Sequence, residues 1–380
     1  MSKTFGVGIM GAGNISSAYL RLAPLFKGLE VRAVADILPE AAKARAAEFG
    51  VAAQSPDELL KNSEIDVIVN LTVPAAHYRV SSEIISAGKH AYSEKPFVLT
   101  LEEGKALRRE ADARKLRVGS APDTFLGGAH QQARNLIDTG KIGRITSGTT
   151  HVMSRGMEHW HPNPDFFFQV GAGPVLDIGP YYVTDLIQLI GPVRRVTAFT
   201  GSAQAERTIS TPTSPLKGQK IKVGTPTTIH GVLEFHNGAI VTLGTSWDVF
   251  SHGHGPIELY GTEGSLYVPD PNFFGGDLVI ANQDGVKETV TPWQHALGIA
   301  NQDNPNGPRR ANYRTAGLAD MMQSIDEGRP ARCGIDIALH AVDVMTSLLL
   351  AGETGHVVML TTTCERPAAL GPVEAQALLK

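Results

Sequence analysis

The chain has 380 residues, of which 42% are hydrophobic and 19% are charged, and its formal net charge is −4. This length exceeds what one hydrophobic core usually serves, so two domains are expected. A slightly acidic chain offers no basic stripe to neutralise phosphates, and nucleic acid is therefore not expected as a partner. The two cysteines, Cys333 and Cys364, lie far apart in the sequence, which argues against a disulfide framework and a paired-cysteine metal site.

The N-terminal residues lack the charged segment and apolar segment of a secretory leader. No apolar stretch approaches the ~20 residues that cross a bilayer. These two observations predict a cytoplasmic protein that does not contact a membrane.

From residue 4 to residue 121, short apolar runs alternate with amphipathic stretches. Strands are predicted at residues 5–10, 31–35, 67–71, 90–93 and 117–120. Helices are predicted between them at residues 15–26, 40–49, 56–61, 78–87 and 101–114. This alternation is typical of right-handed βαβ units, and it predicts a doubly wound parallel sheet over residues 1–121.

Residues 122–380 show a different pattern. Helices are predicted at 129–138, 175–190, 313–327 and 336–351, strands at 144–152, 194–200, 228–235, 239–247, 256–260 and 265–268, and a long loop at 203–224. Within 228–235, Ile229, Leu233 and Phe235 share one face, which is typical of a sheet with one face covered and one open. We therefore expect an α+β domain with a large, mostly antiparallel, open-faced sheet, and a homo-oligomer (dimer or tetramer) formed through the open face.

The first predicted strand ends in a glycine-rich turn. Gly11-x-Gly13-x-x-Ser16 stands between a strand and a helix, as the phosphate loop of a Rossmann domain does, and Asn14 and Ile15 lead into that helix. Gly11 permits the tight turn, and Gly13, which lacks Cβ, lets a pyrophosphate approach the amides at the helix N-terminus. The motif predicts a dinucleotide site at residues 11–16.

Asp36 stands at the end of the second predicted strand, near the spacing at which an acid binds the adenosine ribose. No Arg or Lys follows it directly, so a 2′-phosphate would face an unbalanced carboxylate. NAD is therefore expected in preference to NADP. The alternative is a glycine-rich turn with an incidental aspartate.

Three further motifs occur in order along the chain. They are Thr72-Val73-Pro74-Ala75-Ala76-His77, the segment from Ala87-Gly88-Lys89-His90 to Glu94-Lys95-Pro96, and Gly173-Pro174-Val175-Leu176-Asp177-Ile178-Gly179. With the glycine turn, this combination resembles the Gfo/Idh/MocA family of glucose–fructose oxidoreductase, inositol dehydrogenase and relatives. The resemblance spans essentially the whole chain and implies an NAD-dependent oxidoreductase.

The resemblance implies that Lys95 lies beside the nicotinamide and touches the reacting hydroxyl, and that Glu94 holds the nicotinamide ribose. Thr72, Pro74 and His77 are implied to line the same cofactor. A partly desolvated lysine near a positive ring is expected to have a lowered pKa, which suits proton transfer near neutral pH. The alternative is a surface lysine before a loop proline.

The third motif departs from the family pattern, because Tyr181 stands where Asp-x-Gly-x-His has its histidine. The departure puts the usual imidazole proton shuttle in doubt. A phenol can donate to or accept from a substrate oxygen, although its reference pKa near 10 makes it a poor base without help from Lys95. Asp177, four residues earlier on the same helix face, is expected to meet the same ligand. The alternative is that Tyr181 only packs and Asp177 only caps.

Five other residues are candidates for substrate contact. His159, Trp160 and His161 lie in a proline-rich loop before the third motif, and Asp123 and Phe125 follow the last strand of the first domain. Simple packing is an alternative for each of them. The histidines lack partners at metal-ligand spacing, so no metal is expected.

The expected reaction is hydride transfer from a sugar carbon to NAD, with the hydroxyl proton leaving through Lys95, Tyr181 and Asp177. Residues 157–177 together with Asp123-Thr124-Phe125 resemble the D-apiose dehydrogenase branch, which implies oxidation of a free aldose, D-apiose, to its lactone. Inositol or another polyol remains an alternative substrate. An NAD-dependent glycoside hydrolase and a non-catalytic NAD-binding regulator, both of which resemble this fold, remain alternative functions.

Overall fold

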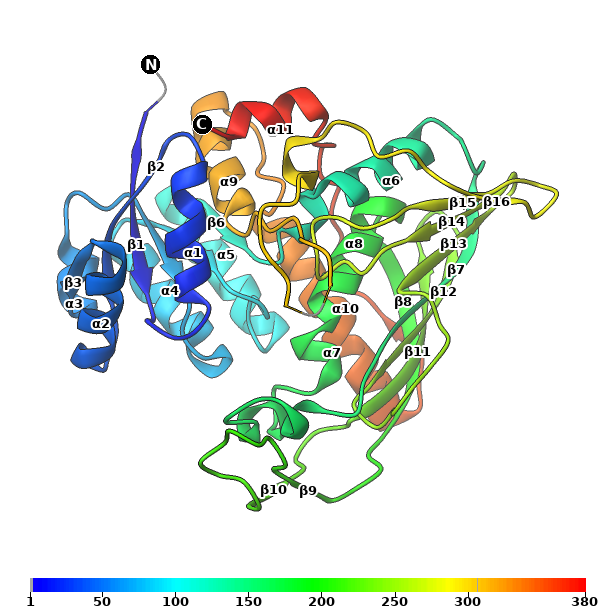
Figure 1. The fold of residues 1–380 in the computed structure, drawn as a ribbon, viewed down its shortest axis with the longest axis horizontal. Helices are drawn as coiled ribbons and strands as arrows, with labels where there is room; N and C mark the ends of the chain where they lie inside the picture. Colours follow the sequence, from blue (N-terminus) through cyan, green and yellow to red (C-terminus); the bar gives the residue numbers. More distant parts are fainter. Residues whose placement is uncertain (1–2, 306) are drawn as a thin grey trace.

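The computed structural model describes residues 3–305 and 307–380 and contains two sheets with helices packed on them (Figure 1). Met1 and Ser2, where a leader was sought, lie outside the described residues. The first sheet has the order β3-β2-β1-β4-β5-β6 and is parallel throughout. Its strands are β1 (Phe5–Met10), β2 (Leu29–Ala35), β3 (Ala52–Gln54), β4 (Val67–Asn70), β5 (His90–Ser93) and β6 (Val118–Ser120). Strand order reverses beside β1, which places the expected ligand crevice there.

The helices between these strands are α1 (Ser16–Leu22), α2 (Pro39–Phe49), α3 (Pro56–Lys61), α4 (His77–Ser86) and α5 (Leu101–Arg114). Local sequence explains several ends: Ser55 and Thr100 form capping boxes with Glu58 and Glu103, and Gly50 ends α2 in the left-handed conformation. The predicted Rossmann domain is confirmed. Strand β3 was missed because it is three residues long and partly exposed.

The second sheet has the order β16-β15-β14-β13-β7-β12-β11-β8-β17, and its one parallel pair among the described residues is β7–β12. Its strands are β7 (Ile145–Met153), β8 (Val193–Gly201), β11 (Thr228–Phe235), β12 (Ile240–Ser246), β13 (Ile257–Gly261), β14 (Ser265–Val268), β15 (Val279–Ala281), β16 (Lys287–Thr289) and β17 (Val358–Met359). In β11, Ile229, Leu233 and Phe235 are buried while His230 is exposed, so the one-sided prediction is confirmed.

One face of this sheet is covered by α6 (Gly128–Asp138), α7 (Pro174–Asp177), α8 (Gly179–Ile190) and α10 (Ile335–Thr354) (Figure 1). Helix α10 corrects the sequence analysis, because it is long and apolar enough to cross a membrane by length and composition. It is nevertheless a core helix, since 67% of its apolar window is buried between β8, α8 and α5. The predicted single helix 175–190 is also interrupted, at Ile178 between α7 and α8.

The predicted loop 203–224 contains the two-stranded sheet of β9 (Glu206–Thr208) and β10 (Lys220–Lys222). This lobe has its own apolar core of Met157, Phe167, Phe168, Ile209, Ile221 and Trp247. A buried ion pair links this lobe to the preceding loop, because Arg207 Nη1 lies 2.9 Å from Glu158 Oε1. Short 3₁₀ helices lie at Ala23–Leu25, Pro74–Ala76, Thr124–Leu126, Met157–His159, Asp165–Phe168 and Ala296–Gly298.

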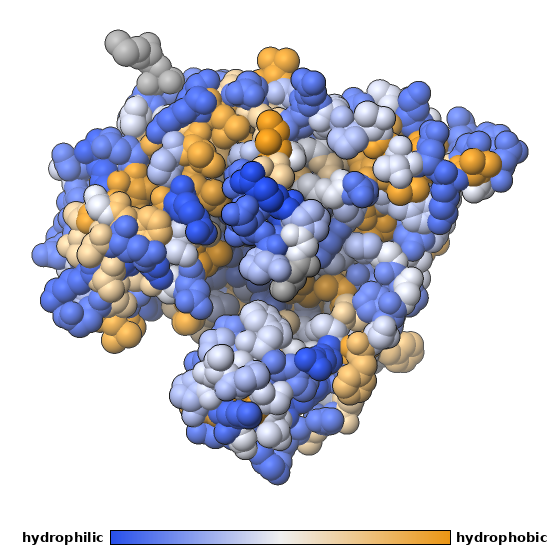
Figure 2. All heavy atoms as spheres, viewed as in Figure 1, coloured by the Kyte–Doolittle hydropathy of each residue, from blue (hydrophilic) through white to orange (hydrophobic). Residues whose placement is uncertain are grey.

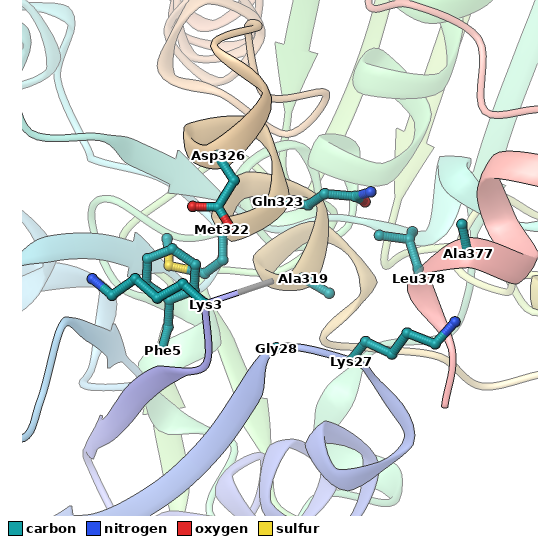
Figure 3. A pocket seen from close by; sticks show the side chains of 10 residues that line it. All are labelled: Lys3, Phe5, Lys27, Gly28, Ala319, Met322, Gln323, Asp326, Ala377 and Leu378. Carbon is teal, nitrogen blue, oxygen red and sulfur yellow. The ribbon is translucent and has the colours of Figure 1, made fainter. Parts of the chain in front are cut away.

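The end of the chain returns to the first domain. Helices α9 (Ala316–Glu327) and α11 (Pro372–Leu378) pack on β1 and α1, and the Lys27 amide donates to the Leu378 carbonyl at 2.8 Å. A small hollow of about 90 Å³ remains at this joint, lined by residues such as Lys3, Phe5, Met322 and Leu378 (Figure 3). The first hydrophobic core is thus built from both ends of the chain.

Candidate active site

The central feature of the site is an ion pair between the two domains. Lys95 follows β5, and its Nζ donates to the Asp177 carboxylate Oδ1 at 2.8 Å and to the Asp177 main-chain carbonyl at 2.7 Å. Asp177 ends α7, which begins after Gly173, a residue with φ of 87°. Both side chains are largely buried but retain some exposure, 18% for Lys95 and 19% for Asp177. A charged donor and acceptor therefore meet in a partly desolvated place where a ligand can reach them.

The electrostatics of Lys95 differ from the sequence expectation of a lowered pKa. Burial alone lowers the pKa of the amine, but the negative field of Asp177, Tyr181 and Glu94 outweighs burial and raises the pKa above its ordinary value. Without a cofactor charge nearby, Lys95 is thus a firmly protonated ammonium at neutral pH. The sequence-based expectation of a lowered pKa did not include Asp177 as the direct partner of Lys95.

Tyr181 is buried on the first turn of α8, and the Lys95 Nζ lies 5.5 Å from its ring centroid. The structure therefore brings together Lys95, Asp177 and Tyr181, the three residues that the sequence analysis placed at the chemistry. The expected arrangement on one continuous helix face is not found, because Asp177 ends α7 and Tyr181 lies on α8, two successive helices that meet at Ile178.

The glycine turn lies at the end of β1 and fits a dinucleotide. Gly11 has φ of +109°, and a Cβ there would lie 2.6 Å from the Leu71 carbonyl oxygen, so this position requires glycine. At Gly13 a Cβ would meet nothing within 4 Å, which leaves the open space that an approaching pyrophosphate needs. Asn14 is exposed and Ile15 half-buried at the start of α1.

Asp36 lies against this turn. Its Oδ2 accepts the Ala12 amide at 2.7 Å, and its Oδ1 accepts the Leu38 amide at 2.9 Å. Each oxygen has remaining acceptor capacity, and the carboxylate is half-exposed. The residues at the end of β2 thus fit an adenosine ribose.

Glu94 and Thr72 occupy the ends of β5 and β4. Glu94 Oε1 accepts the Tyr19 hydroxyl at 3.0 Å, and its Oε2 accepts the Lys95 amide at 3.0 Å. Thr72 Oγ1 donates to Asn70 Oδ1 at 2.7 Å. Both residues are half-buried at the same sheet edge as the glycine turn, which keeps them within the candidate cofactor crevice.

His77 lies behind the crevice rather than in it. The imidazole is buried, with Nδ1 2.7 Å from the Pro96 carbonyl and Nε2 3.0 Å from the Thr72 carbonyl. Burial lowers its pKa. Both ring nitrogens face backbone oxygens, so the imidazole links the Thr72 and Pro96 segments.

A cleft of about 290 Å³ opens at the Lys95–Asp177 pair. The surface is hollowed between the first domain and the lobe that carries β9 and β10 (Figure 2). Pro74, Pro96, Leu99, Phe166, Phe167 and Val170 are among its lining residues. Its walls come from both domains, so a ligand in the cleft is held between them.

Asp123 and Phe125, expected to contact substrate, are buried and do not line this cleft. Asp123 is 2% exposed, and its Oδ2 accepts the amides of Thr315 and Gly317 at 2.9 and 3.0 Å. Burial raises its pKa to about 6. Phe125 belongs to the first hydrophobic core. These positions are corrected: Asp123 anchors the start of α9, and Phe125 packs.

The three aromatic residues of the 159–161 loop also lie outside the cleft lining. His159 Nδ1 is 2.6 Å from Ser210 Oγ, and Trp160 is exposed. The His161 ring packs edge-on against Phe166 and Phe167 at 5.6 and 5.0 Å. His161 therefore supports the cleft wall from behind, while His159 holds the β9–β10 lobe.

The sequence analysis missed Arg314, which precedes α9. Its Nη2 donates to the carbonyl oxygen and Oδ1 of Asn272 at 3.0 Å, and although burial lowers the pKa of the guanidinium, the nearby Tyr181, Asp123 and Glu94 raise it above its ordinary value. Arg314 lies 133 positions beyond Tyr181 in the sequence, and no motif pointed to it. Its isolation from every motif explains why it was overlooked.

Together, the fold and the site define a two-domain oxidoreductase with a dinucleotide-binding domain. A model of the oxidoreductase family with an NAD-binding Rossmann fold matches residues 5–121, and a model of the Gfo/Idh/MocA C-terminal domain matches residues 130–267. The two matches cover more than half of the chain. The chain therefore belongs to the Gfo/Idh/MocA family.

Relatives are similar over 37% to 70% of this chain. Levoglucosan dehydrogenase of Pseudarthrobacter phenanthrenivorans is 26% identical over 291 residues, 70% of this chain and 73% of that protein. D-glucoside 3-dehydrogenase of Escherichia coli is 28% identical over 254 residues, 65% of this chain and 71% of that protein. Two uncharacterized oxidoreductases of Schizosaccharomyces pombe, at 33% and 29% identity, match 41% and 37% of this chain, and the match spans only 42% and 39% of their length.

Solved structures show the same fold. Levoglucosan dehydrogenase in complex with NADH and L-sorbose has a TM-score of 0.77 at 21% identity, and the match covers 94% of this chain and 99% of that one. An NAD binding oxidoreductase from Klebsiella pneumoniae has a TM-score of 0.79 at 20% identity, with 95% and 100% covered. Both domains are therefore arranged as in these proteins.

Proposed function

We propose that the protein is an NAD-dependent dehydrogenase that oxidises a hydroxyl group of a sugar or polyol. The proposal rests on the ion pair between Lys95 and Asp177. This pair lies beside a cleft, and Lys95 follows a strand that ends at the same sheet edge as the glycine turn. Relatives named as levoglucosan, D-glucoside and inositol dehydrogenases support this class of substrate.

NAD accepts the hydride. The chain binds and orients the cofactor and the substrate, and it transfers one proton. Gly11 and Gly13 shape the phosphate turn, while Asp36 and Glu94 bind the two riboses. In the direction of carbonyl reduction, the protonated Lys95 donates to the developing alkoxide. In the direction of oxidation, Lys95 must first lose its proton to solvent so that it can accept the proton of the substrate hydroxyl, and Tyr181, whose ring centroid lies 5.5 Å from Nζ, is proposed to assist this transfer.

The narrower proposal of D-apiose rests on the resemblance of residues 157–177 and 123–125 to that branch. The relatives are named for levoglucosan, inositol and D-glucosides, none of which is D-apiose. The test therefore includes D-apiose together with these three kinds of substrate. Asp123 and Phe125 are buried away from the cleft, which removes part of the support for D-apiose.

The test is a panel of free aldoses, polyols and glycosides with NAD or NADP, followed by NADH absorbance. We expect steady NADH formation with at least one neutral sugar or polyol and a preference for NAD. Aglycone release without net NADH would instead assign a glycoside hydrolase. Tight NAD binding without turnover on any member of the panel would assign a regulator.

A further inference from the structure

The cleft beside Lys95 and Asp177 has few polar side chains with which to hold a sugar. Among the described residues that line it, the polar side chains are those of Lys95, Asp177 and Gln169, and the others are apolar or glycine. Lys95 and Asp177 already bond to each other, and Gln169 Nε2 donates to Asp165 Oδ1 at 3.2 Å. A free aldose or polyol carries a hydroxyl on nearly every carbon, and it would leave several of them without a partner here.

We propose that this cleft binds an apolar alkyl or aryl group attached to the sugar, so that the substrate is a glycoside with a hydrophobic aglycone. The reacting hydroxyl then lies beside Lys95, and the aglycone lies against the apolar walls of the cleft. The proposal rests on the proposed function, because it names the substrate class of that same site.

The wall that the second domain contributes is apolar and open to a ligand. Phe166 is 44% exposed and Val170 is 85% exposed, and both line the cleft. Large apolar side chains gathered at a concave place are typical of a site where a ligand removes apolar surface from water. Burial of an aglycone against these two side chains therefore stabilises the complex.

The phenylalanine wall is ordered before a ligand arrives. The ring centroids of Phe166 and Phe167 lie 4.0 Å apart, and Phe167 packs edge-on against Trp247 at 6.0 Å in the core of the β9–β10 lobe. The Gly173 amide donates to the Phe167 carbonyl at 3.0 Å, which fixes the turn that follows. A surface that is already in place loses little freedom on binding.

Leu99 brings apolar surface to the cleft from the first domain. It follows Pro96 and is half-buried. Gly171 has φ of +86°, and a Cβ there would lie 3.0 Å from Leu99 Cδ1, so this glycine lets the two domains approach at the cleft. A ligand in the cleft meets apolar side chains of both domains. A sugar ring can place one C–H face on an aromatic ring, whereas apolar walls from two domains fit an alkyl or aryl group better.

The nicotinamide is the other apolar group that this cleft could receive. Val73 and Pro74 line the cleft and lie in the segment that the family resemblance assigns to the cofactor. Phe166 and Val170 belong to the other domain, so the proposal rests on these two side chains. Its test must therefore measure cofactor affinity and aglycone affinity separately.

The test is a chain-length series of methyl, ethyl, butyl and hexyl β-D-glucosides beside free D-glucose. Calorimetric titration of the NADH-bound protein gives affinity, and NADH formation from NAD gives kcat/KM. For the wild type we expect both to rise about two- to fourfold per added methylene. The heat-capacity change of binding should become more negative along the series. Phe166→Ala should flatten this rise to less than about 1.5-fold per methylene, and so should Val170→Asn, whose exposed position spares the fold.

Phe250→Ala is the matched control, because Phe250 is 89% exposed and lies outside the cleft lining, and we expect the wild-type dependence on chain length. Affinity that is independent of chain length, a dependence that persists in both cleft variants, or no binding of any glucoside would overturn the proposal. A loss of NAD affinity in Phe166→Ala with the chain-length dependence intact would also overturn it, since the wall would then serve the nicotinamide. If the series binds as expected but no sugar yields NADH, the proposed function fails while the apolar site stands.

Discussion

Lys95 Nζ lies 2.8 Å from the Asp177 carboxylate, so one ion pair joins the nucleotide-binding domain to the substrate-binding side of the cleft. Lys95 follows a strand of the parallel sheet, and Asp177 ends a short helix on the second sheet. The pair therefore forms only when the two domains are packed together. A cofactor bound to the first domain and a sugar held by the second would meet at this place.

Replacing Lys95 with Ala should abolish turnover and leave NAD binding nearly intact, because the glycine turn and Asp36 lie on other strand ends. The loss in kcat should be about 100-fold or more, as expected for a proton-transfer group. Steady-state kinetics and NADH fluorescence titration measure the two effects separately. Lys43→Ala, at a lysine whose side chain is 65% exposed, is the control. Lost binding with preserved chemistry would contradict the role of Lys95.

Alanine at Gly11 and at Gly13 should have opposite consequences. At Gly11 the Cβ would lie 2.6 Å from a backbone oxygen in a left-handed residue, so we expect a loss of stability of about 1–3 kcal/mol. At Gly13 the Cβ has open space, so the Tm should stay unchanged while NAD affinity falls. Thermal unfolding and NAD titration of both variants check this. Unchanged NAD affinity in Gly13→Ala would contradict the prediction that the pyrophosphate binds at this turn.

Asp36→Ala should raise the KM for NAD and narrow discrimination against NADP. The variant loses an acceptor for ribose hydroxyls and the charge that repels a 2′-phosphate, with an expected cost of about 1–3 kcal/mol in NAD binding. It also frees the Ala12 and Leu38 amides. Asp36→Asn, which keeps an oxygen acceptor, separates the charge from the hydrogen bonds. The KM ratio for the two cofactors is the measurement, and an unaltered ratio in both variants would refute the assignment.

Asp123 should make stability depend on pH. Burial raises its pKa from 3.8 to about 6, so the carboxylate destabilises the fold above pH 6 by on the order of 3 kcal/mol. That penalty disappears as the pH falls from 6 toward 4. Asp123→Asn keeps an oxygen for the Thr315 and Gly317 amides and should be more stable than wild type at pH 7.5, with the difference shrinking toward pH 4. Denaturant unfolding across this range measures it, with Asp123→Ala as the destabilised control.

The open face of the second sheet should mediate self-association. Phe199 on β8 is 82% exposed and pairs in register with His230, which lies on the open face of the sheet, so an aspartate at this position would place a charge in an interface formed by that face. We expect Phe199→Asp to shift the protein toward monomer in analytical ultracentrifugation with NAD binding unchanged. Val373→Asp, at an exposed position on α11, serves as the control. A wild-type monomer at micromolar concentration would contradict the expected homo-oligomer.

Local sequence was sufficient to predict much of the fold. The strands at Phe5–Met10, His90–Ser93, Thr228–Phe235 and Ser265–Val268 and the helix at Leu101–Arg114 have the predicted bounds. Their signals are periodicity, capping residues and turn glycines, all of which act over a few residues. Short strands such as β15, β16 and β17, with two or three residues each, carry too little pattern to be detected.

By itself the sequence predicted the two sheets and the phosphate turn, and it singled out Lys95, Asp177 and Tyr181 as site candidates, because each of these signals is carried by neighbouring residues. Only the tertiary structure decided that Asp123 and Phe125 are buried, that Lys95 keeps its proton through Asp177, and that Arg314 donates to Asn272. Burial and charge pairing depend on segments that lie far apart along the chain and become neighbours once α9 packs across the end of β6.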